Sequence, residues 1–257
     1  MMRGMQNDFS RPLAVMAIVN RTPDSFYDKG KTFALDAAVA AGAAAFEAGA
    51  TIVDVGGVKF APGPAVAIED EIALVVPVVR ELALLGDVSV DTFHPAVARA
   101  AIEAGAAIIN DTTGLRDPQM ADVVADSEAR IVIAHSLATP RTQHPLPHYD
   151  DVTAEVGAFL RQRSDLALER GIPAERIIID PGHDLNKNTL QTLEITRRLD
   201  EIAAIGFPLL VALSNKDFIG EALGRERDQR VAGSLAAAVV CVLHGASIVR
   251  AHNVPET

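Results

Sequence analysis

The stretch Ile177-Ile178-Ile179-Asp180-Pro181-Gly182 decides the fold class predicted for this chain. Three β-branched apolar residues in a row are typical of a strand that is buried on both faces, as in parallel sheets. The run ends at a carboxylate, and Pro181 and Gly182 interrupt further strand pairing. A carboxylate at the end of a buried strand is costly unless it has a partner, and in α/β barrels the carboxyl ends of the strands carry the site. The plainer alternative is that Asp180 only caps the next helix.

The same pattern, a short apolar run followed by a helical segment, recurs along the chain. The predicted strands are residues 14–19, 51–55, 88–90, 106–109, 130–134, 177–180, 208–213 and 246–249. Strands that alternate with helices in a chain of 257 residues indicate a single (β/α)8 TIM barrel over residues 13–257. Residues 1–12 are polar and are expected to form a flexible leader. A flavodoxin-like or Rossmann sheet is the alternative, but no G-x-G-x-x-G follows the first strand.

The end of the chain departs from the barrel pattern. Only a few residues follow the last predicted strand before Thr257, so the eighth helix is expected to be missing from this chain. An apolar outer face without its helix favours association with a second copy or with another segment. We therefore expect a homodimer.

Composition limits the classes of partner. Hydrophobic residues make up 49% of the chain, which indicates a globular protein, and the formal net charge of −11 argues against non-specific binding to nucleic acid or to an anionic membrane. No run of 18 apolar residues and no signal-peptide pattern is present. Cys241 is the single cysteine, so an intrachain disulfide is excluded. These features together predict a cytoplasmic protein.

Polar side chains stand at the ends of nearly all predicted strands. They are Asn20, Asp54, Asp91, Asn110 with Asp111, His135, Asp180, Lys216 and Arg250. In a barrel these positions share one mouth, where carboxylates and amides suit the edge of a flat heterocycle that is rich in N–H groups. Lys216, Arg250 and His252 add positive charge, predicted on another side of the mouth, where a phosphate could bind.

Each of these residues also has a purely structural interpretation. Asp54 precedes two glycines and could cap a turn, and Asp91 with Thr92 could cap the helix that begins near Pro95. His135 is more often a hydrogen-bonded histidine of the barrel rim than a ligand. Capping alone is a poor explanation for polar residues at so many successive strand ends.

Several motifs, taken together and in order, resemble dihydropteroate synthase. They are NRTPDSF (20–26), VDT (90–92), IND (109–111), TPRT (139–142), YDDV (149–152), DPG (180–182), LSNKDFIG (213–220) and VRAHNV (249–254). The resemblance implies a (β/α)8 barrel, usually a homodimer. It also implies a reaction that joins p-aminobenzoate to 6-hydroxymethyl-7,8-dihydropterin diphosphate with release of diphosphate, and Mg²⁺ as the cofactor.

The resemblance implies roles for individual residues. Those expected to hold the pterin are Asp91, Asn110, Asp180 and Lys216. Those expected at the diphosphate are Asn20, Arg250 and His252, with Asn20 also facing the Mg²⁺. Lys216 and Arg250 are the expected catalytic residues, because cations near the leaving group stabilise the negative charge that develops on diphosphate.

The departures from the family pattern cluster in the loops. Phe60 and Ala61 replace a Thr and an Arg of the second loop, and Lys59 is displaced by two positions from that Arg. Arg21 stands where the family has Val. Residues 183–186 (HDLN) replace a run rich in Gly and Phe, and Ser136, Asn215 and Asn253 replace a Met, an Arg and an Asp.

Three hypotheses about function follow. In the first, the chain is a diverged second paralogue of dihydropteroate synthase that keeps a pterin and diphosphate pocket but has weak or lost synthase activity. In the second, it is a fully active synthase with an unusual lid, in which Arg21 takes over from the missing loop arginine. In the third, it is an enzyme or a non-catalytic binder for another phosphorylated heterocycle. The sequence leaves open whether the chain is an enzyme.

Overall fold

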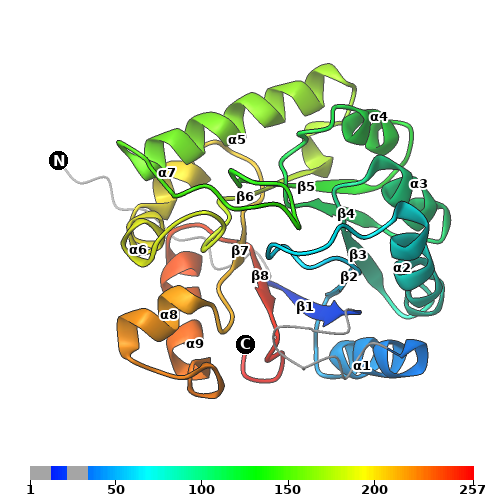
Figure 1. The fold of residues 1–257 in the computed structure, drawn as a ribbon, viewed down its shortest axis with the longest axis horizontal. Helices are drawn as coiled ribbons and strands as arrows, with labels where there is room; N and C mark the ends of the chain where they lie inside the picture. Colours follow the sequence, from blue (N-terminus) through cyan, green and yellow to red (C-terminus); the bar gives the residue numbers. More distant parts are fainter. Residues whose placement is uncertain (1–12, 22–33) are drawn as a thin grey trace.

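The computed structural model describes residues 13–21 and 34–257 as a single (β/α)8 barrel (Figure 1). The leader predicted over residues 1–12 lies outside the described residues. The strands are β1 (Ala14–Asn20), β2 (Ile52–Gly56), β3 (Asp87–Asp91), β4 (Ile108–Asp111), β5 (Arg130–Ala134), β6 (Ile177–Asp180), β7 (Leu210–Ala212) and β8 (Ile248–Ala251). All eight predicted strands are confirmed, and their ends shift by no more than two residues.

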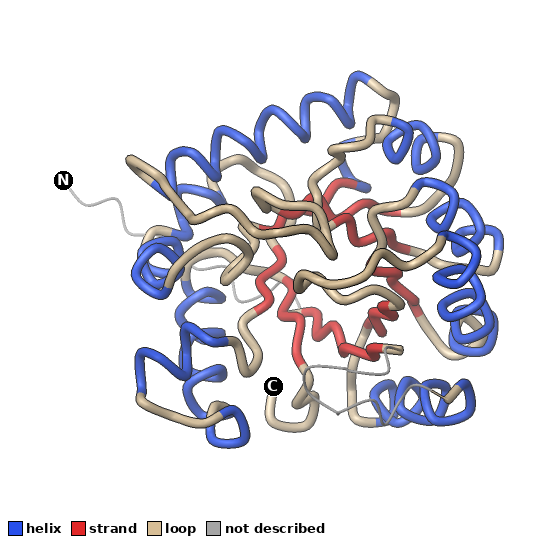
Figure 2. The backbone as a smooth tube through the Cα atoms, viewed as in Figure 1, coloured by secondary structure: helices blue, strands red, loops and turns tan. Residues whose placement is uncertain are grey.

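The strands form one parallel sheet in the order β6-β5-β4-β3-β2-β1-β8-β7. A parallel bridge between Ile179 and Leu209 joins the two outer strands, so that the sheet closes on itself. The tube drawing shows this ring of strands surrounded by helices (Figure 2). The closed ring explains the apolar runs in the sequence, because each strand is buried both toward the barrel axis and toward a helix.

The helices occupy the outside of the ring (Figure 1). They are α1 (Leu35–Glu47), α2 (Ile68–Leu82), α3 (Pro95–Glu103), α4 (Gln119–Ala125), α5 (Val152–Glu169), α6 (Thr189–Arg197), α7 (Leu199–Ala203), α8 (Asp217–Leu223) and α9 (Val231–Leu243). Short 3₁₀ turns, Ala174–Arg176 and Arg227–Gln229, precede β6 and α9. Among the described residues no helix is long and apolar enough to cross a membrane.

The structure corrects two helix predictions. The sequence predicts one helix over residues 191–205, but the structure divides this segment into α6 and α7 at Arg198, whose backbone is not helical (φ −111°, ψ 27°). The guanidinium of Arg198 forms ion pairs with Asp151, Glu194 and Glu201, which hold the break in place. Helix α8 was not predicted, because seven residues are too few to show a helical period.

The described residues after β8 form turns instead of a helix. Residues 252–257 lie between α9 and α1 (Figure 1). Hydrogen bonds stabilise this turn, because the hydroxyl and the amide of Thr257 donate to the carbonyl of Asn253 at 2.7 and 3.1 Å. The expected absence of a helix after the last strand therefore holds for the described residues.

Two separate apolar cores follow from the alternation of side chains along each strand. One core fills the space between the sheet and the helices. The other fills the barrel interior and consists of Met16, Ile52, Ile108, Val132, Ile178, Leu210, Ala212 and Ile248. Because side chains two apart on a strand share a face, the interior core fixes which residue of each strand faces the mouth of the barrel.

Candidate functional site

Most of the polar residues at the strand ends face the barrel axis because they lie on the same face of their strand as a residue of the interior core. Asp54, Asn110, Asp180 and Arg250 each follow a residue of that core by two positions. In β6, for example, Ile178 points inward, so Asp180 does too. The same parity turns Asp111 outward. Its carboxylate accepts hydrogen bonds from Thr113 and Leu115 at 2.6–2.8 Å, so Asp111 caps a loop and does not belong to the site.

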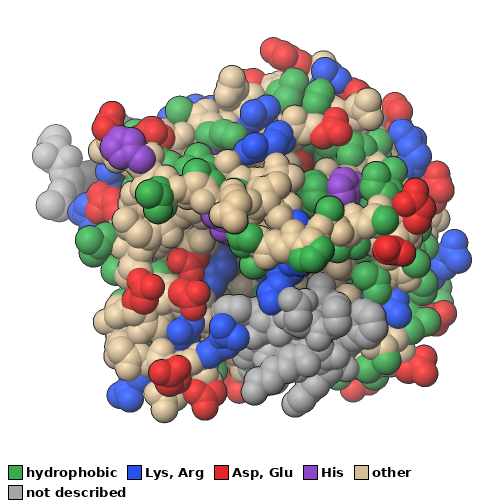
Figure 3. Space-filling view, in the orientation of Figure 1, with side chains coloured by type: hydrophobic (Ala, Val, Ile, Leu, Met, Phe, Trp, Pro, Cys, Tyr) green, Lys and Arg blue, Asp and Glu red, His purple; other side chains and the backbone are tan. Residues whose placement is uncertain are grey.

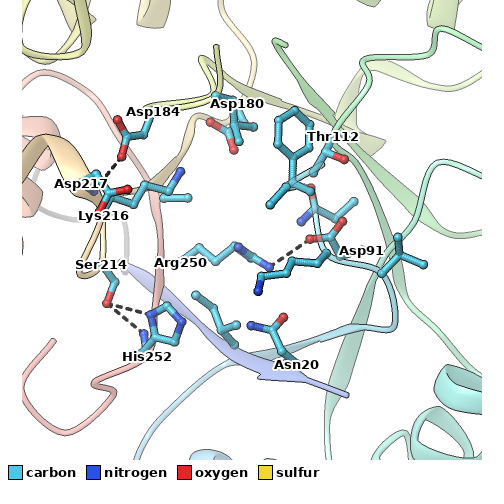
Figure 4. A pocket seen from close by; sticks show the side chains of 18 residues that line it. Asn20, Asp91, Thr112, Asp180, Asp184, Ser214, Lys216, Asp217, Arg250 and His252 are labelled. Atoms are coloured by element: carbon cyan, nitrogen blue, oxygen red, sulfur yellow. Dashed lines mark hydrogen bonds and ion pairs between the residues drawn. The ribbon is translucent and has the colours of Figure 1, made fainter. Parts of the chain in front are cut away.

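One pocket of about 260 Å³ opens at the carboxyl ends of the strands (Figure 4). Its lining includes the residues assigned to the site and to the altered second loop, namely Asn20, Phe60, Ala61, Asp91, Asn110, Asp180, Lys216, Arg250 and His252. Asp54, Asp111 and His135, which also stand at predicted strand ends, are not in the lining. The space-filling view shows Lys and Arg side chains gathered around a hollow in this face (Figure 3). The sequence therefore identified one pocket, while the roles assigned to its residues remain predictions.

Arg250 lies at the floor of this pocket, between two carboxylates. Its Nε donates to Asp54 Oδ2 at 2.6 Å, and a terminal nitrogen reaches Asp91 Oδ2 at 3.2 Å. Asn110 Nδ2 donates to the same Asp54 oxygen at 3.3 Å. The prediction that Arg250 stands on another side of the mouth from the acids is therefore wrong, because β8 pairs with β1 and the long arginine crosses the barrel. Asp54, which was considered as a turn cap, is its fully buried counter-ion.

Burial controls the protonation of the acids around the floor. It raises the pKa of Asp91 to about 7, with Asp54, Glu71 and Asp111 adding to the rise and Arg250 opposing it. Burial also raises the pKa of Asp180, while Lys216 and the backbone N–H of Gly182, which donates to Asp180 Oδ1 at 2.7 Å, oppose that rise. Asp91 is a strong acceptor in its ionised form, so its hydrogen bonding to a ligand depends on pH near neutrality.

Lys216 occupies the side of the pocket that the loops after β6 and β7 form (Figure 4). Its ammonium donates to the carbonyl of His183 and lies in the field of Asp180 and Asp184. Burial lowers the pKa of Lys216, and the two carboxylates oppose this change. Below it, the hydroxyl of Ser214 contacts both the amide nitrogen and Nδ1 of His252 at 3.2 Å, which orients the imidazole.

A buried lysine supports the loop between β6 and α6. Lys187 Nζ contacts His135 Nδ1 at 2.9 Å and donates to the carbonyls of Gly182 and Leu185 at 2.9 and 3.0 Å. Burial lowers the pKa of Lys187 to about 7, and burial together with Lys187 lowers the pKa of His135 to about 3. His135 does not line the pocket, in agreement with its interpretation as a rim histidine.

Gly182 is required where this loop leaves β6. Its φ is +66°, and a Cβ atom on it would collide with the carbonyl oxygen of His135. A glycine is the residue that tolerates both the left-handed backbone and the close approach. The turn places the Asp180 carboxylate under the backbone N–H of Gly182.

The loop after β2 is hydrogen-bonded to the loop after β5. Arg141 donates from Nε to the carbonyl of Pro64 at 2.9 Å and from a terminal nitrogen to the carbonyl of Ala61 at 3.2 Å. Its amide donates to the carbonyl of Phe60 at 3.3 Å, and the Phe60 ring packs at 4.9 Å from that of His144. The guanidinium of Arg141 thus donates to backbone carbonyls of the loop after β2. The residues of this loop that line the pocket include Lys59, Phe60 and Ala61.

Arg21 does not reach the pocket. It donates to the backbone carbonyls of Ala73 and Leu74 in α2, at 3.3 and 2.6 Å, and it is absent from the pocket lining. The idea that Arg21 takes over from the missing loop arginine is therefore wrong. Lys59, in contrast, does line the pocket.

Several lining residues were not predicted. They are Ile18, Val58, Thr112, Asp184, Leu185, Ala212, Ser214 and Asp217. Asp184 is the most informative, because one carboxylate oxygen accepts from the amides of Asp217 and Phe218 at 2.8 and 3.4 Å and so caps α8. The sequence did contain an indication that Asp184 belongs to the site, since it replaces a residue of a Gly- and Phe-rich run in the family.

The comparison with known families agrees with this geometry. The family described as pterin binding enzyme matches residues 16–252 of the chain. The chain belongs to this family. Its members in the comparisons include dihydropteroate synthases, so the resemblance inferred from the motifs is confirmed.

Two curated members of the pterin-binding family cover almost the whole chain. The inactive dihydropteroate synthase 2 of Mycobacterium leprae is 42% identical, over 96% of this chain and 89% of its own length. The dihydropteroate synthase of Escherichia coli is 39% identical, over 99% of this chain and 91% of its own length. Among solved structures, the Xanthomonas albilineans dihydropteroate synthase with 4-aminobenzoic acid has a TM-score of 0.88 and 43% identity, covering 96% of this chain and 89% of that one.

These relatives show that the chain is a dihydropteroate synthase-like protein with a TIM-barrel fold. The family includes both a synthase and a protein named as inactive at similar identity to this chain. Overall sequence identity therefore does not distinguish an active synthase from an inactive one, so the distinction depends on the residues of the pocket.

Proposed function

We propose that this pocket binds a 6-hydroxymethyl-dihydropterin diphosphate and that synthase activity is weak or lost. The observation that supports this proposal is the contrast between the floor and the cover of one pocket. The floor keeps Asp91, Asn110, Asp180 and Arg250 in contact with the cavity, whereas the second loop contributes Phe60 and Ala61 to it.

The pterin would lie on the floor with its N–H-rich edge toward the acids. The Asp91 and Asp180 carboxylates accept from ring and amino N–H groups, with about 1.5–3 kcal/mol for each charge-assisted hydrogen bond. Asn110 Oδ1 is buried and has no hydrogen-bond partner in the part of the chain that the structure describes. A buried acceptor without a donor is costly, so a ligand N–H at this position is favoured.

The chemistry requires charge stabilisation at the leaving group. The amine nitrogen of p-aminobenzoate forms a bond to the pterin methylene carbon, the C–O bond to diphosphate breaks, the diphosphate keeps the electron pair, and the amine loses a proton. Lys216 and His252 would face the departing diphosphate. Arg250 would contribute from below, but its charge is already balanced by Asp54 and Asp91.

Mg²⁺ fits the residues only with help from the substrate. Among the described residues no group of three His, Cys, Asp or Glu side chains could hold a metal ion. Mg²⁺ commonly takes one or two protein oxygens and completes its octahedron with substrate phosphates and water. The amide oxygen of Asn20, which lines the pocket, would be its protein ligand here. When bound, the ion neutralises negative charge on the leaving diphosphate.

The altered loop is the reason to expect weak activity. The resemblance places an Arg and a Thr where this chain has Ala61 and Phe60, and Arg141 is engaged with backbone carbonyls instead of the cavity. Loss of one preorganised donor at a developing charge costs about 10²–10³-fold in rate.

A synthase assay of the purified protein tests this proposal. The wild type should release diphosphate at least about a hundred-fold more slowly than an active synthase measured alongside it, with and without Mg²⁺. The double variant Phe60→Thr with Ala61→Arg should raise turnover about ten-fold or more, while Leu146→Thr, at an exposed residue outside the pocket lining, should not.

Two results would count against the proposal. Full activity of the wild type would establish the alternative of a working synthase with an unusual lid. Absence of calorimetric heat with a pterin diphosphate would favour the other alternative, an enzyme or a binder for another phosphorylated heterocycle.

The homodimer and the cytoplasmic location also remain proposals. Three apolar residues of α9, Val239, Val240 and Leu243, are 39–59% exposed, which supports association through this helix. Light scattering of the wild type and of Val239→Glu tests it, since the charge should shift a dimer toward monomer.

A further inference from the structure

We propose that Asp184 sets the charge class of the second ligand, so that the pocket accepts a neutral aromatic amine and disfavours an aromatic carboxylate. This inference rests on the proposed pterin site. It concerns the other half of the same pocket, next to the loops after β6 and β7.

The location of the second ligand follows from the space that the floor leaves. In Figure 4 Asp91 and Thr112 lie on one side of the cavity, and Asp184, Asp217 and Lys216 lie on the opposite side. A pterin over the floor acids leaves the second side for its coupling partner. Asp184 and Leu185 form part of that wall.

The second wall offers a ligand carboxylate little uncompensated positive charge. Lys216 is the cation of the wall, and it already lies in the fields of Asp180 and Asp184, while its ammonium donates to the His183 carbonyl. Asp217 also lines this wall, but its carboxylate is ion-paired with Arg230 at 2.7 Å. A ligand carboxylate placed here would therefore meet like charges and an ammonium whose charge is compensated.

Arg250 does not supply that positive charge either. It lies at the floor, where it is ion-paired to Asp54 at 2.6 Å and to Asp91 at 3.2 Å. Lys59, the remaining lysine of the lining, belongs to the loop after β2 and not to this wall. A carboxylate ligand would have to draw Arg250 away from a counter-ion that has no exposure to solvent.

The position of Asp184 is fixed by its surroundings. Its φ of +65° lies in the left-handed region that favours glycine, so the loop carries an aspartate where the backbone is unfavourable for a side chain. Its amide donates to Thr192 Oγ1 at 3.3 Å, and its carboxylate accepts from the amides of Asp217 and Phe218. These contacts keep the carboxylate at the wall of the pocket.

The consequence is a preference between two ligands of nearly the same shape. p-Aminobenzamide and p-aminobenzoate differ in charge at one end, so their relative affinity reports the charge of the wall. Replacement of Asp184 by Asn removes the negative charge and retains an amide oxygen to accept from the α8 amides.

The test is calorimetry on the full-length protein. The pocket is first filled with a pterin diphosphate analogue in which a methylene group replaces the ester oxygen between the pterin methylene carbon and the first phosphorus. The bond that breaks in the reaction is then absent, so no reaction follows. p-Aminobenzamide and p-aminobenzoate are then titrated in parallel into the wild type, Asp184→Asn and Asp217→Asn. We expect the wild type to bind the amide more tightly, and Asp184→Asn to shift the amide-to-acid affinity ratio toward the acid about ten-fold.

Asp217→Asn is the matched control, because it removes the same charge from the same rim. The Asp217 carboxylate is 61% exposed and paired with Arg230 at 2.7 Å, so its removal should leave the ratio nearly unchanged. Equal shifts in both variants, a wild type that prefers the acid, or binding of neither compound would overturn the inference. Failure of the pterin diphosphate analogue to bind would instead overturn the proposed function.

Discussion

Replacement of Arg250 by Met would leave two carboxylates at the barrel floor without their cation. In the native protein the guanidinium holds Asp54, which has no solvent exposure, at 2.6 Å and Asp91 at 3.2 Å. After the substitution Asp54 would retain the 3.3 Å hydrogen bond from Asn110 to the same oxygen, and its other oxygen has no partner among the described residues. The floor would then hold buried negative charge that nothing neutralises.

The magnitude follows from the burial of the pair. Removal of one partner of a buried ion pair costs about 3–5 kcal/mol. For a chain of this length that loss corresponds to a decrease in melting temperature of roughly 10 °C. The same substitution at Arg130, whose ion pair with Asp87 is 35% and 52% exposed, should cost less than about 1 kcal/mol.

The pH dependence of the loss distinguishes charge from packing. The pKa of Asp91 is about 7 with Arg250 in place, so Asp91 is already protonated at about pH 5 and Arg250 then stabilises only one carboxylate. Chemical denaturation of wild type and Arg250→Met should therefore give a smaller difference in unfolding free energy at about pH 5 than at about pH 8. Equal losses at both pH values, or a loss no larger than that of Arg130→Met, would refute this reasoning.

The other predictions concern the acids and the β6 loop. Because the pKa of Asp91 is raised to about 7 and the ionised form accepts N–H groups, calorimetric affinity for a pterin should increase as pH rises through about 7, and Asp91→Asn should abolish this dependence. Gly182→Ala should lower the unfolding free energy by more than about 2 kcal/mol, since it combines a left-handed φ with a collision against His135; an unchanged denaturation midpoint would contradict the backbone argument. The pKa of Lys187 is lowered to about 7 in the folded state, so the folded protein binds fewer protons than the unfolded chain between about pH 7 and 10; its stability should rise with pH there, and the rise should be weaker in Lys187→Met.

The fold could be predicted because the barrel repeats one local pattern. Runs such as 177–179 are apolar on both faces, and such runs are typical of strands inside a closed parallel sheet. The site could be predicted because polar residues end the strands, and the structure explains their convergence, since Asp180 and Asn110 follow core residues by two positions. Short elements without a period, such as α8, were missed for the same reason that the strands were found.

The parts of the site that escaped prediction depend on pairs that are distant in sequence. Arg250 and Asp54 are separated by 196 residues and meet only because the barrel closes through β8 and β1. Arg21 has the right charge at the right end of a strand, yet carbonyls of α2 hold its guanidinium. Asp184 reaches the start of α8 through a left-handed turn that nothing in its neighbours specifies.

The salt-bridged floor has a consequence for how sequences of this family are interpreted. Arg250 and the acids beside it neutralise one another without any ligand, so the folded chain needs them whether or not a reaction takes place above them. A gene copy released from catalysis would still be selected to keep these residues as long as the protein must remain folded. Retention of Arg250 with Asp54 and Asp91 therefore reports an intact scaffold by itself, and the covering loops are the part of the sequence that records a change of chemistry.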